Sequence, residues 1–132
     1  MKVYNPDEGL ERIMELSEKC NQRPVLIAVI GLPNSGKTFL RERAKEKFHK
    51  KNIGGTSSYD HGYHYEFSSA YDYFFIHATC SNPKEVSSFT QQSLGRDVNI
   101  AVYIYNPFVE TPNVDELEEY DVTIENSGAR RK

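Results

Sequence analysis

The stretch that decides the fold reads Gly31-Leu32-Pro33-Asn34-Ser35-Gly36-Lys37-Thr38. Directly before it, residues 25–30 (VLIAVI) form an apolar, β-branched run, which is typical of a strand buried in a parallel sheet. Directly after it, the apolar residues of segment 39–48 recur at helical spacing. The stretch therefore matches G-x-x-x-x-G-K-[ST] and has the strand, glycine loop and helix that this motif requires.

The residue types of this loop suit the binding of a phosphate chain. Gly31 and Gly36 let the backbone turn tightly and approach phosphate oxygens closely. The N–H groups of residues 31–36 then point inward at a helix N-terminus, where the helix dipole favours negative charge. Lys37 supplies a mobile positive charge for the β- and γ-phosphates, and the Thr38 hydroxyl is placed to ligate Mg²⁺. We expect all of residues 31–38 to bind a nucleotide; a plain turn between strand and helix is the alternative.

On these residues the chain resembles the P-loop NTPase superfamily. The ending Asp121-Val122-Thr123-Ile124-Glu125-Asn126-Ser127-Gly128 is similar to the last core strand of nucleoside and nucleotide kinases. Residues 23–31 are similar to the beginning of uridine-kinase-like proteins. The resemblance implies a shortened domain of that kind, with ATP and Mg²⁺ as ligands and with Asn126, Ser127 and Gly128 beside the nucleotide base. An ordinary exit from strand to turn is the alternative for these last residues.

The order of the elements predicts a single α/β domain over residues 1–132. Helices are expected over 6–20, from the loop to about 50, over 83–94 and over 113–119, and strands over 25–30, 57–67, 71–78, 98–105 and 121–125. Residues 52–55 are expected to stop the helix that follows the loop. Strands that alternate with helices favour a three-layer sandwich, in which a mainly parallel, five-stranded sheet is flanked by helices as in the P-loop NTPase fold.

Two residues raise the question of the metal and the catalytic base. By resemblance to the kinases, Asp60 follows the second strand and orients the acceptor hydroxyl or takes its proton; a solvated Asp in a turn is the alternative. His77 stands where those kinases carry an acidic Mg²⁺ ligand. The metal would then rely on Thr38, phosphates and water, or on Asp60 or Asp72. A hydrogen-bonded structural histidine is the simpler interpretation of His77.

The segment between the fourth and fifth expected strands also departs from the kinase pattern. Kinases of this branch close an arginine-bearing lid there, whereas residues 106–120 contain no Lys or Arg and five acidic residues. An arginine near the phosphates is often worth orders of magnitude in rate. The candidate cations elsewhere are Arg41, Arg43, Lys84, Arg96 and the tail 130–132. A protein partner that supplies an arginine is the other expectation.

Three further patterns give weaker signals. His61, His64 and Cys80 could suggest zinc, but His61 and His64 fall on opposite faces of the expected strand. The aromatic stretch 59–73 is either a pocket for a base or a packed strand surface. GTPases carry D-x-x-G and N-K-x-D, and neither pattern is matched here. Guanine specificity therefore has no support in the sequence, and ATP or another nucleoside triphosphate is the expected ligand.

Composition limits the class of protein. A hydrophobic share of 38% and a charged share of 27% are typical of a globular domain. No apolar run reaches the roughly 18 residues that span a bilayer, and the N-terminus lacks an apolar signal core.

Two unpatterned cysteines, Cys20 and Cys80, favour a reducing, cytoplasmic setting. Residues 52–129 carry twelve acids against two basic residues, which argues against a nucleic-acid surface, although the tail 130–132 is basic.

These observations lead to two functional expectations. The first is an ATP-dependent phosphotransferase for a small hydroxyl acceptor, or an NTP hydrolase, with Lys37 and Asp60 as the catalytic residues. The second is a nucleotide-binding module with little or no turnover, which works with a protein partner. The intact residues Gly31, Gly36, Lys37 and Thr38 favour the first, and His77 with the acidic lid segment favours the second.

Overall fold

The computed structural model describes residues 2–56, 70–79 and 81–128. At its centre lies the strand β2 (Val25–Ile30), in which every residue is buried. β2 pairs in parallel with β4 (Tyr73–Ala78) on one side and with β5 (Ile100–Tyr105) on the other. The apolar run before the loop is thus the central strand, because a strand covered on both faces must be apolar along its whole length.

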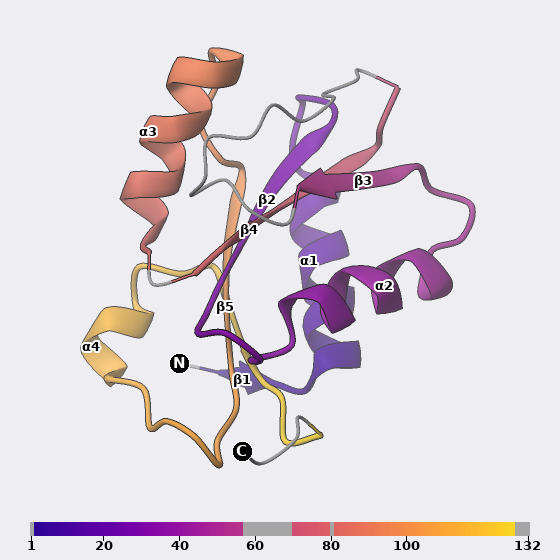
Figure 1. Ribbon diagram of the computed structural model, residues 1–132. Helices are drawn as coiled ribbons and strands as arrows, with labels where there is room; N and C mark the ends of the chain where they lie inside the picture. The colour runs from indigo at the N-terminus through magenta and orange to yellow at the C-terminus, as the bar shows by residue number, and fades with distance from the viewer. Residues whose placement is uncertain (1, 57–69, 80, 129–132) are drawn as a thin grey trace.

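The sheet is larger than expected. It has six strands in the order β1-β6-β5-β2-β4-β3, and every pair is parallel (Figure 1). β6 (Val122–Glu125) lies beside β5, and the short strand β1 (Val3–Tyr4) forms one edge. The expected count of five strands was therefore wrong: β1 is too short for its periodicity to show in the sequence, and only pairing with β6 makes it a strand.

The other edge strand, β3 (Ile53–Thr56), begins where we expected a helix stop at residues 52–55. The expectation of a helix stop depended on Gly54 and Gly55, and it was wrong. A Cβ atom at Gly54 would lie 2.6 Å from the ring of Tyr71, and one at Gly55 would lie 2.6 Å from the carbonyl oxygen of Phe75. These glycines therefore allow close packing in a strand and do not end a helix. The strand expected over 57–67 lies outside the described residues.

Helices cover both faces of this sheet, in three layers. α1 (Pro6–Glu18) and α2 (Lys37–Lys47) lie on one face, and α3 (Pro83–Leu94) lies on the other (Figure 1). Leu10 of α1 and Leu40 of α2 pack on Val29 and alternate strand residues, whereas Val86 of α3 packs on the opposite set, which includes Ile30. Within the described residues, no helix is both long and apolar enough to cross a membrane.

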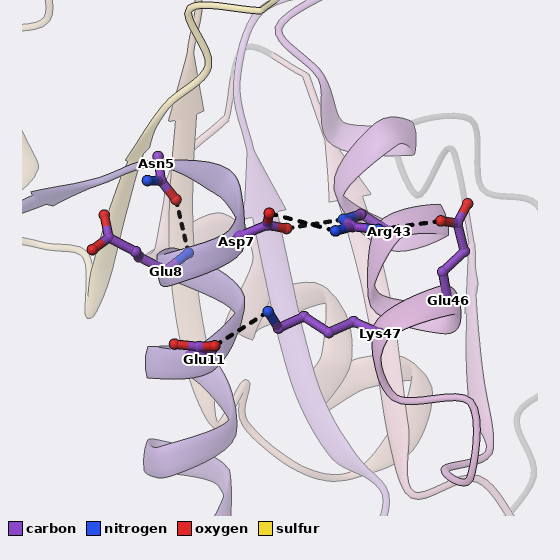
Figure 2. Close-up of polar contacts among 7 residues, drawn as sticks. All are labelled: Asn5, Asp7, Glu8, Glu11, Arg43, Glu46 and Lys47. Atoms are coloured by element: carbon purple, nitrogen blue, oxygen red, sulfur yellow. Dashed lines mark hydrogen bonds and ion pairs between the residues drawn. The ribbon is translucent and has the colours of Figure 1, made fainter.

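Two of these helices begin at asparagine caps. The side chain of Asn5 accepts a hydrogen bond from Glu8 N–H at 2.8 Å (Figure 2), and Asn82 accepts one from Glu85 N–H at 2.9 Å. At its other end α3 stops at Gly95, whose φ of 71° is left-handed. Such caps satisfy backbone groups that have no partner inside the helix, so both helices start where the sequence predicts.

Ion pairs join α2 to α1. Arg43 Nε lies 2.9 Å from Asp7 Oδ1, and Lys47 Nζ lies 3.2 Å from Glu11 Oε1 (Figure 2). The hydrogen bond from Arg43 lowers the pKa of Asp7. These pairs are largely exposed, so each contributes little to the free energy of unfolding. Arg43 is thus engaged by Asp7 of α1 and by Glu46 of its own helix.

Candidate phosphate-binding site

The loop lies where the chain changes direction at the carboxyl ends of the strands. From β2 the chain passes through α2 to β3 at one edge, whereas from β5 it passes through the short helix α4 (Val114–Leu117) to β6 on the other side. Open α/β sheets bind ligands at such a point, because the diverging connections leave a crevice between them. Residues 31–35 line the hollows at this point.

The loop is held tightly by its neighbours. Gly31 N–H donates to the carbonyl oxygen of Ala78, at the end of β4, at 3.2 Å. A Cβ atom at Gly31 would lie 2.6 Å from Ser35 Oγ and would overlap the carbonyl oxygen of Ile104. Gly36 has a φ of 110°, a conformation that L side chains rarely adopt. Both motif glycines are therefore required by the packing of the loop itself.

Lys37 and Thr38 begin α2 directly after the turn. Lys37 Nζ donates to the carbonyl oxygen of Gly31 at 2.9 Å and to that of Leu32 at 2.8 Å, so its charge lies at the start of the loop. Gly36 is the N-cap and provides no side-chain hydrogen bond to the first turn of α2. Helix N–H groups without a side-chain cap suit an anion. The site thus combines a cation with a helix N-terminus.

The described part of the structure offers the side-chain oxygen of Thr38 for a metal ion. Thr38 is exposed at the helix N-terminus and offers a hard hydroxyl oxygen. Among the described residues, no group of three His, Cys, Asp or Glu side chains converges on a point. Mg²⁺ keeps several waters and binds through substrate phosphates, so a single protein oxygen fits this ion. Asp60, His61, His64 and Cys80 lie outside the described residues.

Asn126 supports the loop from the end of β6. Its Nδ2 donates to the carbonyl oxygen of Ser35 at 3.1 Å, and a Cβ atom at Gly36 would overlap this Nδ2. Asn126 is buried, whereas Ser127 and Gly128 are exposed in the turn that follows. The kinase resemblance implied that Asn126 lies beside the nucleotide base. It gave no sign of the contact with Ser35, because 91 residues separate Asn126 from Ser35.

Removal of this amide is expected to destabilise the loop. Asn126→Ala should lower the free energy of unfolding by about 1 to 3 kcal/mol, because the buried Ser35 carbonyl loses its side-chain donor. Urea denaturation measures this loss. The exposed neighbour provides the control, since Ser127→Ala should change stability by less than about 0.5 kcal/mol. Equal stability of the two variants would show that the amide does not support the loop.

His77 is buried on β4, on the face of the sheet that α2 covers. It is 2% exposed, and its Nε2 atom has no hydrogen-bond partner among the described residues. Burial above all, together with the charges of Arg41 and Lys37, lowers the pKa of His77 to about 3. The imidazole is therefore neutral near pH 7, and a neutral ring next to two cations does not replace an acidic Mg²⁺ ligand.

Arg41 adds a second cation on the face of α2 that carries Lys37. The two residues are four apart on the helix, a spacing that places side chains on one face. The Arg41 side chain is 17% exposed, and its Nε atom has no hydrogen-bond partner among the described residues. Arg41 is therefore a cation that shares a face of α2 with Lys37.

Two other candidates lie at the wrong end of the sheet. Asp72 directly precedes β4 and accepts a hydrogen bond from Asn52 N–H at 2.8 Å. Arg96 donates to Asn99 Oδ1 at 2.7 Å, and this oxygen also accepts a hydrogen bond from Leu26 N–H at the beginning of β2. A strand of six residues spans about 20 Å. Asp72 therefore cannot complete a metal shell at the loop, and Arg96 cannot reach the phosphates.

A cavity of about 570 Å³ opens beside the loop. Gly31 and Leu32 form one wall, Tyr103 of β5 forms another, and the acidic segment 110–120 closes the outer side. A second hollow of about 140 Å³ lies between residues 32–35 and Val109. Sequence reasoning missed the larger cavity, since segments far apart in the chain build it.

The comparisons with known proteins gave no match. A scan of protein-family models, a search of curated proteins and a search of solved structures each found nothing similar to this chain. The function proposed below therefore rests on the loop motif and on the geometry around it.

Proposed function

We propose that this chain binds a Mg²⁺-bound nucleoside triphosphate, ATP, at residues 31–38 and transfers its terminal phosphate to a small hydroxyl acceptor. One observation carries this proposal: the ammonium group of Lys37 lies against the carbonyls of Gly31 and Leu32, next to the uncapped N-terminus of α2. A positive charge, a glycine turn and a helix N-terminus at one point favour a chain of phosphates over a single carboxylate.

Each residue of the loop has a role in this reaction. The N–H groups of residues 31–36 bind the phosphate oxygens, and Lys37 moves from its carbonyl partners to the β- and γ-phosphates. Thr38 would hold Mg²⁺. When bound, this ion would neutralise the negative charge that develops on the β- and γ-phosphates during transfer. Arg41, on the same helix face, adds positive potential behind Lys37. Asp60 remains the predicted residue that orients the acceptor or takes its proton.

Loss of the Lys37 charge tests this proposal. Titration of ATP with Mg²⁺ into the wild-type chain should give heat of binding, and Lys37→Ala should weaken that binding by about a hundredfold, since charged hydrogen bonds to phosphate are lost. Lys45 lies on the same helix, exposed and paired with Glu42 at 3.3 Å, so Lys45→Ala is the matched control. Absence of binding to ATP and GTP at millimolar concentration would overturn the proposal.

A nucleotide-binding module without turnover is the second candidate. It is favoured by His77, a buried neutral residue at the position of an acid, and by the acidic segment 106–120, which provides no Lys or Arg. Such a module would need a protein partner to supply an arginine to the phosphates. Binding of ATP without formation of ADP, with any acceptor offered, would support the module and exclude the phosphotransferase.

A further inference from the structure

The large cavity beside the loop has a chemistry opposite to that of the loop. Its ionisable wall residues are three carboxylates, Glu110, Glu116 and Glu119, and two tyrosines, and no Lys, Arg or His of the described chain lines it. Carboxylates repel phosphate, so a triphosphate held by Lys37 would be kept out of this space. The cavity is therefore suited to a molecule other than the nucleotide.

Glu110 is the cavity carboxylate for which the structure gives the surroundings of both oxygens. Its Oε2 accepts a hydrogen bond from Tyr103 Oη at 2.8 Å. Its Oε1 is shielded from solvent and has no hydrogen-bond partner among the described residues. A carboxylate oxygen in that position is costly unless a donor reaches it. The unpaired oxygen indicates that a hydrogen-bond donor is missing here. This indication is independent of the acidic residues around the cavity.

The tyrosines complete a wall that favours cations. The rings of Tyr103 and Tyr120 lie 5.1 Å apart, measured between their centroids, at the inner side of the cavity. Burial above all, together with the charges of Glu119 and Glu116, raises the pKa of Tyr120 to about 12, so this hydroxyl stays neutral. Aromatic faces attract ammonium groups, and nearby carboxylates strengthen that attraction.

Two residues of the phosphate loop also form part of the cavity wall. Gly31 and Leu32 line it, and their carbonyls are the two groups that hold Lys37 Nζ. A molecule in the cavity would therefore lie next to the end of the loop from which Lys37 reaches for the terminal phosphate. The volume of about 570 Å³ leaves room for a molecule the size of a sugar together with bound water.

From this geometry we infer that the cavity binds the phosphoryl acceptor, and that this acceptor is an amino alcohol with a positively charged ammonium group. The inference rests on the proposed phosphotransferase function. The acceptor hydroxyl oxygen forms a bond to the terminal phosphorus of ATP, and the bond from that phosphorus to the bridging oxygen breaks, its electron pair leaving with ADP. The hydroxyl proton passes to the Glu110 carboxylate, which Tyr103 holds through Oε2, and Asp60 then keeps the predicted role of orienting the acceptor.

Matched pairs of small molecules test this inference without nucleotide. Serinol is compared with glycerol, and glucosamine with glucose, because each pair differs at one ammonium group. Calorimetry should show at least one ammonium compound binding about tenfold more tightly than its neutral partner, as a charged hydrogen bond requires. Equal binding within every pair, or no binding by any compound, would overturn the inference.

Variants of the cavity then locate the effect. Glu110→Gln should remove the preference for the ammonium compound, and it should slow ADP formation with that acceptor by at least about a hundredfold. Glu116→Gln, an exposed change that leaves the fold intact, should weaken the preference about threefold. Glu118 is exposed on the same segment outside the cavity, so Glu118→Gln should behave as wild type. Equal effects of the variants at 116 and 118 would contradict the assignment.

The two proposals fail in different ways. If ATP binds but charged and neutral alcohols bind alike, the acceptor inference is wrong and the nucleotide site stands. If ATP does not bind while the ammonium compound does, the phosphotransferase is wrong and the cation-binding cavity stands. Phosphorylation of a neutral alcohol in preference to its ammonium partner would keep the reaction and reject the proposed acceptor.

Discussion

Acidification from pH 7.5 to about pH 4.5 is expected to cost this protein about 2 to 3 kcal/mol of unfolding free energy through His77 alone. The pKa of His77 falls from 6.5 to about 3 in the folded chain because the ring is buried. Between these values the unfolded chain binds a proton that the folded chain does not. The stabilisation is therefore complete above about pH 6.5 and is lost as the pH falls toward 3.

Urea denaturation at a series of pH values measures this loss. His77→Gln has no titrating ring, so its stability should fall less steeply over the same range, the remaining slope coming from carboxylates. His49 is exposed on the surface after α2. His49→Gln should therefore keep the wild-type slope. If the unfolding free energy of wild type and of His77→Gln fell in parallel with pH, protonation of the buried ring would not destabilise the folded chain.

Gly31→Ala is expected to disturb both the stability of the loop and its binding of ATP. The added Cβ atom would overlap the carbonyl oxygen of Ile104 and lie 2.6 Å from Ser35 Oγ. A backbone carbonyl cannot rotate away as a side chain can, so β5 or the loop must shift. We expect a loss of about 3 kcal/mol in unfolding free energy, and ATP binding weaker by at least about tenfold.

Chemical denaturation and calorimetry with ATP check both parts of this expectation. Gly128→Ala is the matched control, because the nearest atom to its added Cβ would be Asn126 Oδ1 at an ordinary 3.7 Å. The control should stay within about 0.5 kcal/mol of wild type. A Gly31→Ala variant with wild-type stability and affinity would mean that the loop accommodates the methyl group.

The sequence by itself determined the local structure around the loop. Residues 25–30 are apolar throughout, which predicts a strand covered on both faces, and the structure confirms this strand. The helices expected to begin at residues 6 and 83 do begin there, next to the caps Asn5 and Asn82. At both helix starts the decisive hydrogen bond joins residues three positions apart, so the local sequence specifies it.

Only the tertiary structure decided which distant residues meet at the loop. Asp72 and Arg96 seemed suitable by residue type, but parallel strands place both at the amino ends of the sheet. Asn126 reaches Ser35 across 91 residues, and Glu110 lines one cavity with Gly31 and Leu32, which no local pattern reveals. Strand order and register set these contacts, and both depend on the packing of the whole sheet.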